Sequence, residues 1–577
     1  MKAPLRQVVV RSLLIGVVVA APGLARAQST SDYAAELARI AMERAQASGQ
    51  AAQQPAMTLT LDQAVKMALE HNLDIAVEAL NPRTFDFSIA ALESGYRPTL
   101  TSNFTNGDRI TLPNSQLTGV TDKLETKSVG WSSGMTQSFR RSGGSLTVGF
   151  NNQRLDSSNL FATRNPSYTS SISASFVQPL LRGFKIDGAR AQLQVTRINQ
   201  EISEVQLRAT ITNTLANVRN AYWDLVYANQ AVDVARRSLD LADKLVEDNK
   251  IRVEIGTMAP IDVVQAEAEA ANRRLSLAQV EATLRTSELV LKRLLVNGTD
   301  DVVWRSTIDP VDRPTFKPEP VDVTAAVRAA LDKRTDLAQA HKQLATNDIN
   351  LRQLVNLTLP ALDVTASYGL TGLGGTQFAR SGLGGAVTRV VPGGYGDALG
   401  NLKGLDAPNW NIALNLSYPI GASAADANLA RARLQQQQTQ AQLKQLELQV
   451  ATEVTNAALQ VQNTLRRVEA ATAARELSQR RLEAEQSKFE VGMTTNFFVV
   501  QAQRDLSDAQ NTELRAQLDY RKSLVDFERV QETSLSRAGI TVVSGGGGTT
   551  GSGATGGRTG GTGGPGGTGG GGGGGGS

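Results

Sequence analysis

The sequence contains no cysteine, two histidines and few aromatic residues, which make up 5% of the 577 positions. Without cysteine it can form neither a disulfide framework nor a lipid attachment on an N-terminal cysteine. His71 and His341 stand in no metal-binding motif, and the sequence has no P-loop, G-x-S-x-G or H-E-x-x-H pattern. We therefore expect a protein that is not an enzyme and that uses no cofactor or metal.

Charge of one sign is also lacking, because 59 basic and 55 acidic residues give a net charge of +4 and are spread along the chain. A nucleic-acid-binding protein gathers its basic residues into a patch or stripe. The sequence therefore predicts no nucleic-acid partner.

Long hydrophobic runs are missing after the N-terminus, since no stretch approaches about 18 consecutive apolar residues. The N-terminus itself has Lys2, Arg6 and Arg11 before an apolar run from Leu13 to Ala21, and then Ala25-Arg26-Ala27. This order is typical of an export signal, which we place at residues 1–27. The alternative is an uncleaved anchor.

Both ends of the remaining chain have low complexity. Residues 28–56 are rich in Ala, Gln and Ser, and residues 536–577 are mostly Gly, Thr and Ser. Such composition cannot bury a core, so we expect a flexible N-terminal segment and a disordered Gly-rich tail.

Between these ends the sequence is internally duplicated, with the first repeat at 57–320 and the second at 321–535. Landmarks recur in the same order at offsets of 262, 240 and 236 positions. The matching segments are 64–69 with 326–331, 178–180 with 418–420, and 255–257 with 491–493. A duplication with ordered landmarks predicts two copies of one structural unit.

Each repeat contains a very long helical segment, at 186–254 and 422–490. Apart from Gly188 these segments lack Pro and Gly, and their apolar residues recur in coiled-coil steps of three and four. Nearly 70 residues give a rod of roughly 100 Å, which must pack against other long helices. We expect tips at 255–261 and 491–497, returning helices at 262–296 and 498–533, and a linker at 297–320.

Strands are predicted before each long helix, at about 98–104 and 170–180 and at about 360–368 and 409–420. In 410–418 apolar or aromatic residues alternate with small or polar ones, which is typical of strands in an outer-membrane β-barrel. The alternative is a half-buried sheet on a soluble core. We interpret 105–169 as an inserted hairpin or an external loop, and the Gly-rich 369–408 as a loop.

Each change between helix and strand carries a proline. Pro98 and Pro360 stand where a helix passes into a strand, and Pro179 and Pro419 where a strand passes into a long helix. Proline stops a helix from continuing and is tolerated at strand ends. These four residues therefore predict the α/β junctions.

The duplicated order of strand, long helix, tip and helix, together with residues 178–183 and the two tips, resembles the TolC-type outer-membrane efflux proteins. The resemblance implies a mainly α fold with membrane β-structure. In that fold a homotrimer forms a 12-stranded outer-membrane β-barrel continued by a periplasmic α-helical barrel. Four spanning strands per chain are too few to close a barrel, which needs about eight, whereas three copies give about twelve.

The resemblance also implies a role and partners. The family role is a passive exit duct for efflux or type I secretion in the outer membrane of a Gram-negative bacterium, in contact with its lipid. A periplasmic adaptor would join the duct to an inner-membrane pump of the RND, ABC or MFS class.

In this family inward-coiling helices close the periplasmic end, and the best-known members narrow it with aspartate rings after the second tip. Here the matching residues are Phe498 and Gln501, and the first repeat keeps Asp262 with Gln265 one turn later. We expect a neutral constriction at Phe498 or Gln501 that gates by dewetting or packing. The alternatives are coiled-coil packing of Phe498 and a helix-dipole role for Asp262, which follows Pro260.

At the tips, Gly256 and Gly492 favour the left-handed backbone that ends a helix. With Thr257 and Thr494 they are our candidate adaptor-docking residues, by resemblance. The rival interpretation of the chain is a soluble periplasmic coiled-coil adaptor or structural protein.

Overall fold

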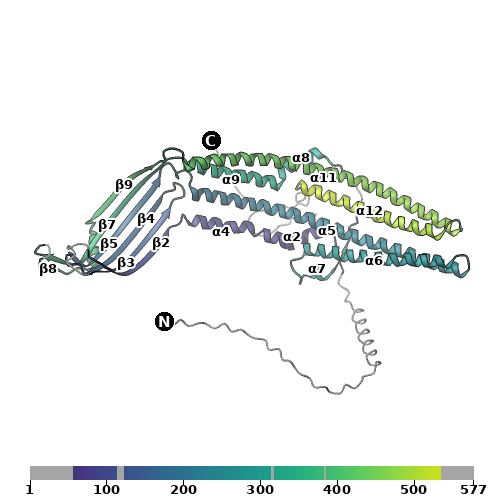
Figure 1. Ribbon diagram of the computed structural model, residues 1–577, viewed down its shortest axis with the longest axis horizontal. Helices are drawn as coiled ribbons and strands as arrows, with labels where there is room; N and C mark the ends of the chain where they lie inside the picture. Colours follow the sequence, from purple (N-terminus) through teal and green to yellow (C-terminus); the bar gives the residue numbers. More distant parts are fainter. Residues whose placement is uncertain (1–55, 114–122, 314–317, 383–384, 534–577) are drawn as a thin grey trace, which may run out of the picture.

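The computed structural model describes residues 56–113, 123–313, 318–382 and 385–533. The expected signal peptide, nearly all of the N-terminal segment and the Gly-rich tail lie outside these residues. In the described part, a long bundle of helices carries a β-sheet at one end (Figure 1).

Two long helices run along the bundle, α5 (Gly188–Glu254) and α11 (Ala424–Glu490), each of 67 residues. At 1.5 Å per residue each is roughly 100 Å long. The chain then turns back into α6 (Pro260–Leu295), which packs on α5, and into α12 (Asn496–Val530), which packs on α11 and α5. Both tips therefore lie at the end of the molecule far from the sheet (Figure 1).

Shorter helices pack along the half of the bundle nearer the sheet. α4 (Asn81–Ser94) lies on α5, and α9 (Thr335–Leu357) lies on α5 and α11. Further from the sheet, α2 (Leu61–His71) and α3 (Leu73–Glu78) contact α5, and α8 (Val323–Lys333) contacts α11. Within the described residues, no helix combines the length and apolar character needed to cross a membrane.

The segment 297–320, which we expected as a linker, contains short secondary structure in its described residues. This segment contains α7 (Val302–Arg305) and β6 (Thr307–Pro310), and β6 pairs in parallel with β1 (Ala56–Leu59). The hydroxyl of buried Tyr222 on α5 links the pair, because it lies 2.7 Å from Asp312 Oδ2, just after β6, and 3.0 Å from the Leu59 carbonyl oxygen in β1.

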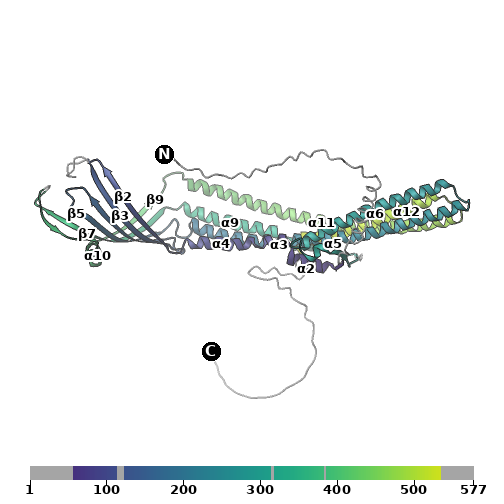
Figure 2. The same cartoon turned by 90° about the horizontal axis from the view of Figure 1, so that it is seen from below.

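The large sheet contains six long strands in which each is antiparallel to its neighbour, and it is strongly curved (Figure 2). Their order across the sheet is β2 (Thr99–Thr111), β3 (Leu124–Ser138), β4 (Ser145–Ser157), β5 (Arg164–Pro179), β7 (Ala361–Arg380) and β9 (Pro408–Ser417). A seventh, short strand, β8 (Val387–Val391), pairs with the far end of β7.

The number of strands corrects the sequence expectation of four spanning strands per chain. Within the segment 105–169, the described residues include a hairpin, β3–β4, that is inserted in the sheet between β2 and β5. Three of the four expected strands, β2, β5 and β7, are longer than predicted, and β9 is shorter. A count of twelve for three copies therefore does not follow from this sheet.

The expectation of a loop at 369–408 was also wrong. There β7 continues to Arg380, and β8 and the helix α10 (Tyr395–Gly404) follow. Glycine is needed because α10 lies directly on the strand. A Cβ atom at Gly372 would stand 1.9 Å from the Ala398 carbonyl oxygen, and one at Gly374 would stand 2.1 Å from that of Gly394.

Candidate functional site

The two faces of the large sheet differ in chemistry. Residues paired across antiparallel strands point to the same side, so the register assigns each side chain to a face. The apolar face includes Leu100, Phe104, Trp131, Met135, Val148, Phe150, Ile172, Phe176, Val364, Tyr368, Ile412 and Leu414. The polar face includes Thr101, Asn103, Ser132, Thr136, Thr147, Asn151, Ser171, Ser173, Ser175, Thr365, Ser367, Asn411 and Asn415.

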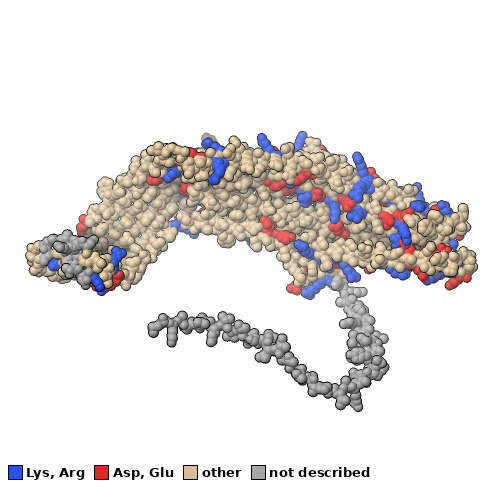
Figure 3. Space-filling model, in the orientation of Figure 1, with Lys and Arg blue, Asp and Glu red and all other residues tan. Residues whose placement is uncertain are grey.

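Away from α10, which covers Gly372 and Gly374 of β7, the apolar face is open in a single chain. Phe104 is 68% exposed, Trp131 45% and Ile412 68%. Charged side chains gather over the helices, and most of the visible sheet carries none (Figure 3). Soluble monomers seldom expose an apolar surface of this extent, so the face requires an apolar environment.

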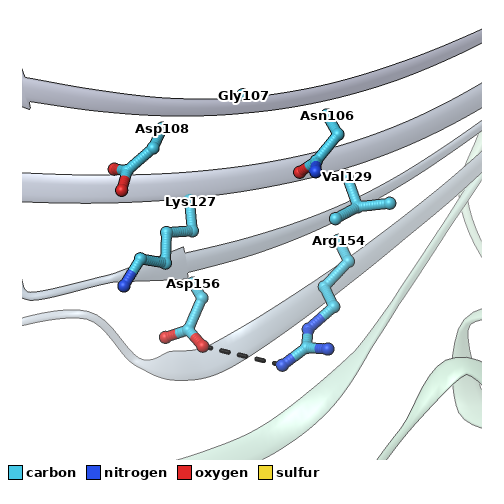
Figure 4. A pocket seen from close by; sticks show the side chains of 7 residues that line it. All are labelled: Asn106, Gly107, Asp108, Lys127, Val129, Arg154 and Asp156. Atoms are coloured by element: carbon cyan, nitrogen blue, oxygen red, sulfur yellow. Dashed lines mark ion pairs between the residues drawn. The ribbon is translucent and has the colours of Figure 1, made fainter.

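At the far end of the sheet the apolar face gives way to charged residues (Figure 4). Asp108, Lys127 and Asp156 lie side by side on β2, β3 and β4, and Arg154 pairs with Asp156 at 3.6 Å. Such a change from apolar to charged rows marks the boundary between an apolar layer and water.

At the other end of the sheet, Arg190 of α5 joins strands to helices. Its side chain is 8% exposed and pairs with Asp187 Oδ2 at 2.9 Å. The guanidinium also donates to the carbonyl of Gly183 and to those of Phe184 at 2.9 Å and Arg141 at 3.2 Å. Because Arg141 belongs to the turn between β3 and β4, Arg190 holds the inserted hairpin against the start of α5.

The four prolines lie at these junctions. Pro98 stands between α4 and β2, and Pro360 between α9 and β7. Pro179 ends β5, and Pro419 lies between β9 and α11.

The two tips have the same local geometry at an offset of 236 residues. Gly256 has φ +77° and Gly492 φ +76°, the left-handed conformation at the end of each long helix. Thr257 N donates to Arg252 O at 2.9 Å, and Met493 N donates to Lys488 O at 2.8 Å. This six-to-one hydrogen bond is the Schellman ending of a helix.

The candidate docking threonines lie just after these glycines. Thr257 Oγ1 donates to the Arg252 carbonyl at 3.0 Å and is exposed. Thr494 Oγ1 donates to Glu485 Oε2 at 3.2 Å and is half-buried. The sequence offset pairs Thr257 with Met493, so the two threonines do not occupy equivalent positions.

The candidate gate residues lie in the first two turns of α6 and α12. The backbone oxygen of Asp262 accepts from Asn496 Nδ2 at 3.3 Å, which brings the two helix starts together. Gln265 is exposed, and Phe498, 49% exposed, meets Phe497 edge-on at 5.6 Å between ring centroids. Gln501 donates to Asp505 at 2.8 Å. Within the described residues no hydrogen bond joins the four to one another.

Sequence reasoning missed the charged network that ties α6 to α12 near the tips. The side chain of Glu269 is 5% exposed. Its carboxylate accepts hydrogen bonds from Arg273 Nε at 2.8 Å and from Arg504 Nε at 2.9 Å. Burial raises the pKa of Glu269, but the hydrogen bonds and charges of Arg504 and Arg273 outweigh it, so the pKa lies below its usual value. Because Glu269 and Arg504 are 235 positions apart, no local pattern indicates the contact.

The fold, a sheet carried on a long bundle of helices, is that of solved outer-membrane channels. The family model for outer membrane efflux proteins matches residues 145–297 and 326–530, which is more than half of the chain. The chain belongs to the outer membrane efflux protein family, as its sequence indicated.

The chain is similar to the cobalt-zinc-cadmium resistance protein CzcC of Cupriavidus metallidurans, at 24% identity over 170 residues. That match covers 28% of this chain and 40% of CzcC. Among solved structures, the CmeC outer membrane channel of Campylobacter jejuni superposes with a TM-score of 0.57 at 15% identity, over 82% of this chain and 85% of CmeC. The outer membrane protein VceC of Vibrio cholerae gives a TM-score of 0.56 at 14% identity, over 82% of this chain and 95% of VceC. These likenesses show the fold.

Proposed function

We propose that the chain is the outer-membrane exit duct of a tripartite efflux or type I secretion system in a Gram-negative bacterium. It acts as a homotrimer, with the sheets forming a barrel in the outer membrane and the helices a tunnel in the periplasm. A periplasmic adaptor connects the duct to an inner-membrane RND, ABC or MFS pump, and the duct itself conducts cargo passively.

The observation that carries this proposal is the two-faced sheet standing on the long helices. Lipid provides the apolar cover that the exposed aromatic and aliphatic side chains need. The opposite face, lined by hydroxyl and amide groups, is suited to water. A passive conduit needs these two surfaces and no reacting group.

The tips support a gate and docking role at the periplasmic end. Phe498 is half-exposed at the start of α12, and three copies around an axis would supply a ring of such side chains. We propose that this ring, or that of Gln501, narrows the duct, with Asp262 and Gln265 beside it. The tips at Gly256, Thr257, Gly492 and Thr494, of which Thr494 is half-buried, provide the adaptor surface.

Divalent metal ions are the first cargo to examine, because CzcC is named for cobalt, zinc and cadmium resistance. Drugs and secreted polypeptides are the other classes that the proposal includes.

Deletion of the gene tests the proposal. We expect a strain without the chain to become sensitive to at least one compound of a panel of metal salts and drugs, or to retain a secreted protein. Restoring the wild-type chain should reverse the defect, and a Thr257→Trp, Thr494→Trp double variant should be extracted from the outer membrane yet fail to reverse it. Recovery of the wild-type chain as a salt-extractable periplasmic protein would contradict the proposal.

A further inference from the structure

The large sheet has two long open edges, β2 and β9. All 13 residues of β2 are exposed, and so are nine of the ten in β9. An open strand edge presents unpaired backbone N–H and C=O groups, which cannot face lipid and must be paired. A second copy of this chain offers a matching open edge.

The direction of the strands fits this arrangement. β2 follows α4 and runs away from the helices, whereas β9 runs back toward α11. When β9 of one copy meets β2 of the next, the two strands are therefore antiparallel, like every neighbouring pair of long strands within the sheet. An even number of strands per chain keeps this alternation around a closed ring.

The inserted hairpin β3–β4 belongs to the wall of the sheet. β3 has 13 residue pairs with β2 and 13 with β4, and β4 continues the register into β5. Trp131 and Phe150 of the hairpin lie on the apolar face, and Ser132 and Asn151 lie on the polar face. The hairpin thus carries the same two-faced pattern as the strands on either side of it.

The turn of the hairpin is built into the junction with the helices. Arg190 donates to the carbonyls of the turn, and Gln178 Nε2 donates to Ser142 O at 2.9 Å. Gly144 fits closely here, because a Cβ on it would lie 3.0 Å from the Val177 carbonyl oxygen. The hairpin is therefore fixed at the end of the wall nearer the helices as well as along its length.

We propose that three copies of this six-stranded sheet close into one barrel of about eighteen strands, which is half again the number expected from four strands per chain. This inference rests on the proposed trimeric duct. Strands 4.8 Å apart and tilted by about 40° give a backbone diameter of roughly 24 Å for twelve strands and roughly 36 Å for eighteen.

The lining of this wide barrel is nearly neutral. By the register, the charged residues on the polar face of the six strands are Arg109, Arg164 and Asp363, and the other polar groups are the hydroxyls and amides of Ser, Thr, Asn and Gln. Such a lumen passes large hydrated solutes without selecting their charge. Selection of cargo then falls to the helical tips.

Electron cryomicroscopy of the full chain in lipid nanodiscs tests the inference. We expect a trimer whose membrane section shows eighteen strands and a backbone diameter near 36 Å. A trimer with a twelve-stranded barrel and the hairpin β3–β4 folded outside it would overturn the inference and leave the proposed duct intact. A particle without a closed membrane section would overturn both.

Engineered cysteines give a second measurement, free of background because the chain has no cysteine. Thr101→Cys on β2, combined in turn with cysteine at 409, 411, 413 or 415 on β9, should yield disulfide-linked trimers in membranes with at least one partner. The control is Thr136→Cys with Thr147→Cys, whose hydroxyls lie 3.4 Å apart on β3 and β4 and which should link within one chain. Intersubunit links from β3 rather than β2 would overturn the proposed edge.

Discussion

Replacement of Arg190 by methionine should release the turn between β3 and β4. Methionine keeps most of the length and apolar stem of the side chain but removes every donor. Asp187 is affected least, because its side chain is 31% exposed and still accepts from the backbone N of residue 190 at 2.8 Å. The turn itself loses its two hydrogen bonds from the guanidinium, at the carbonyls of Arg141 (3.2 Å) and Arg140 (3.4 Å).

The size of the effect follows from these two bonds. A hydrogen bond to a charged donor contributes about 1.5 kcal/mol or more, so losing two costs about 3 kcal/mol of local stability. Since 1.4 kcal/mol is a factor of ten, the open form of the turn should become about 100-fold more populated. The helices and the remaining strands should keep their stability, because local opening does not require global unfolding.

Limited trypsinolysis measures this opening directly, because Arg140 and Arg141 lie in the turn itself. When opening is fast relative to cleavage, the cleavage rate follows the population of the open form. Arg236→Met is the matched control, since Arg236 lies on the same helix, is 61% exposed and pairs with Glu281 at 3.2 Å. Such an exposed pair contributes less than about 1 kcal/mol. Equal cleavage of the Arg190 and Arg236 variants in the turn would refute the assignment of Arg190 as its anchor.

Three further predictions concern α10 and the tips. Gly372→Ala should displace α10, because the new Cβ would stand 1.9 Å from a backbone oxygen of that helix, and hydrogen exchange at 395–404 should rise. The control Gly400→Ala, which has open space around it, should leave exchange there unchanged. Because the pKa of Glu269 is lowered in the folded state, its pairing with Arg504 should stabilise the α6–α12 contact at and above the usual carboxyl range and weaken as pH falls through the lowered pKa. Hydrogen exchange at this contact should therefore rise in acid. Glu269→Gln should abolish that rise, and an unchanged pH profile would count against the network. Gly492→Ala should destabilise the second tip by about 1–2 kcal/mol through its φ of +76° alone, because no atom lies near the new methyl group. The unfolding temperature of the tip, followed by hydrogen exchange, should fall, whereas that of the sheet should not change.

The long helices could be located from the sequence because local signals and tertiary packing agree there. Both lack interior proline, and each begins at an N-cap that the structure places at Asp187 and Ser423. The expected starts at 186 and 422 lie two residues before the observed ones, and the expected ends at 254 and 490 coincide with those in the structure.

The strands were harder to predict, because their side chains alternate between two environments, one on the apolar face of the sheet and one on the polar face. The hairpin β3–β4 begins and ends in charged residues such as Lys127 and Arg154, which hide its alternation. The glycines of β7 were interpreted as a loop, although they make room for α10. A sequence pattern cannot distinguish a glycine that bends the chain from one that admits a neighbouring backbone.

The candidate gate and docking residues remain predictions, since their proposed roles involve a second copy or a partner. The sequence located the helix-ending glycines through their spacing, and the structure gives both the left-handed conformation. The sequence could not indicate the contacts of Arg190 or the Glu269–Arg504 pair, because these contacts depend on segments brought together by the fold.

Thiol labelling along β5 in intact outer membranes tests the central claim most directly. Six single variants, Ser171→Cys, Ile172→Cys, Ser173→Cys, Ala174→Cys, Ser175→Cys and Phe176→Cys, place one thiol on alternate faces of a strand that is paired on both sides. The account predicts that a hydrophilic maleimide labels positions 171, 173 and 175 and that lipid protects 172, 174 and 176. Labelling of all six positions alike, or protection of the serine positions alone, would contradict a membrane wall with a water-filled lumen.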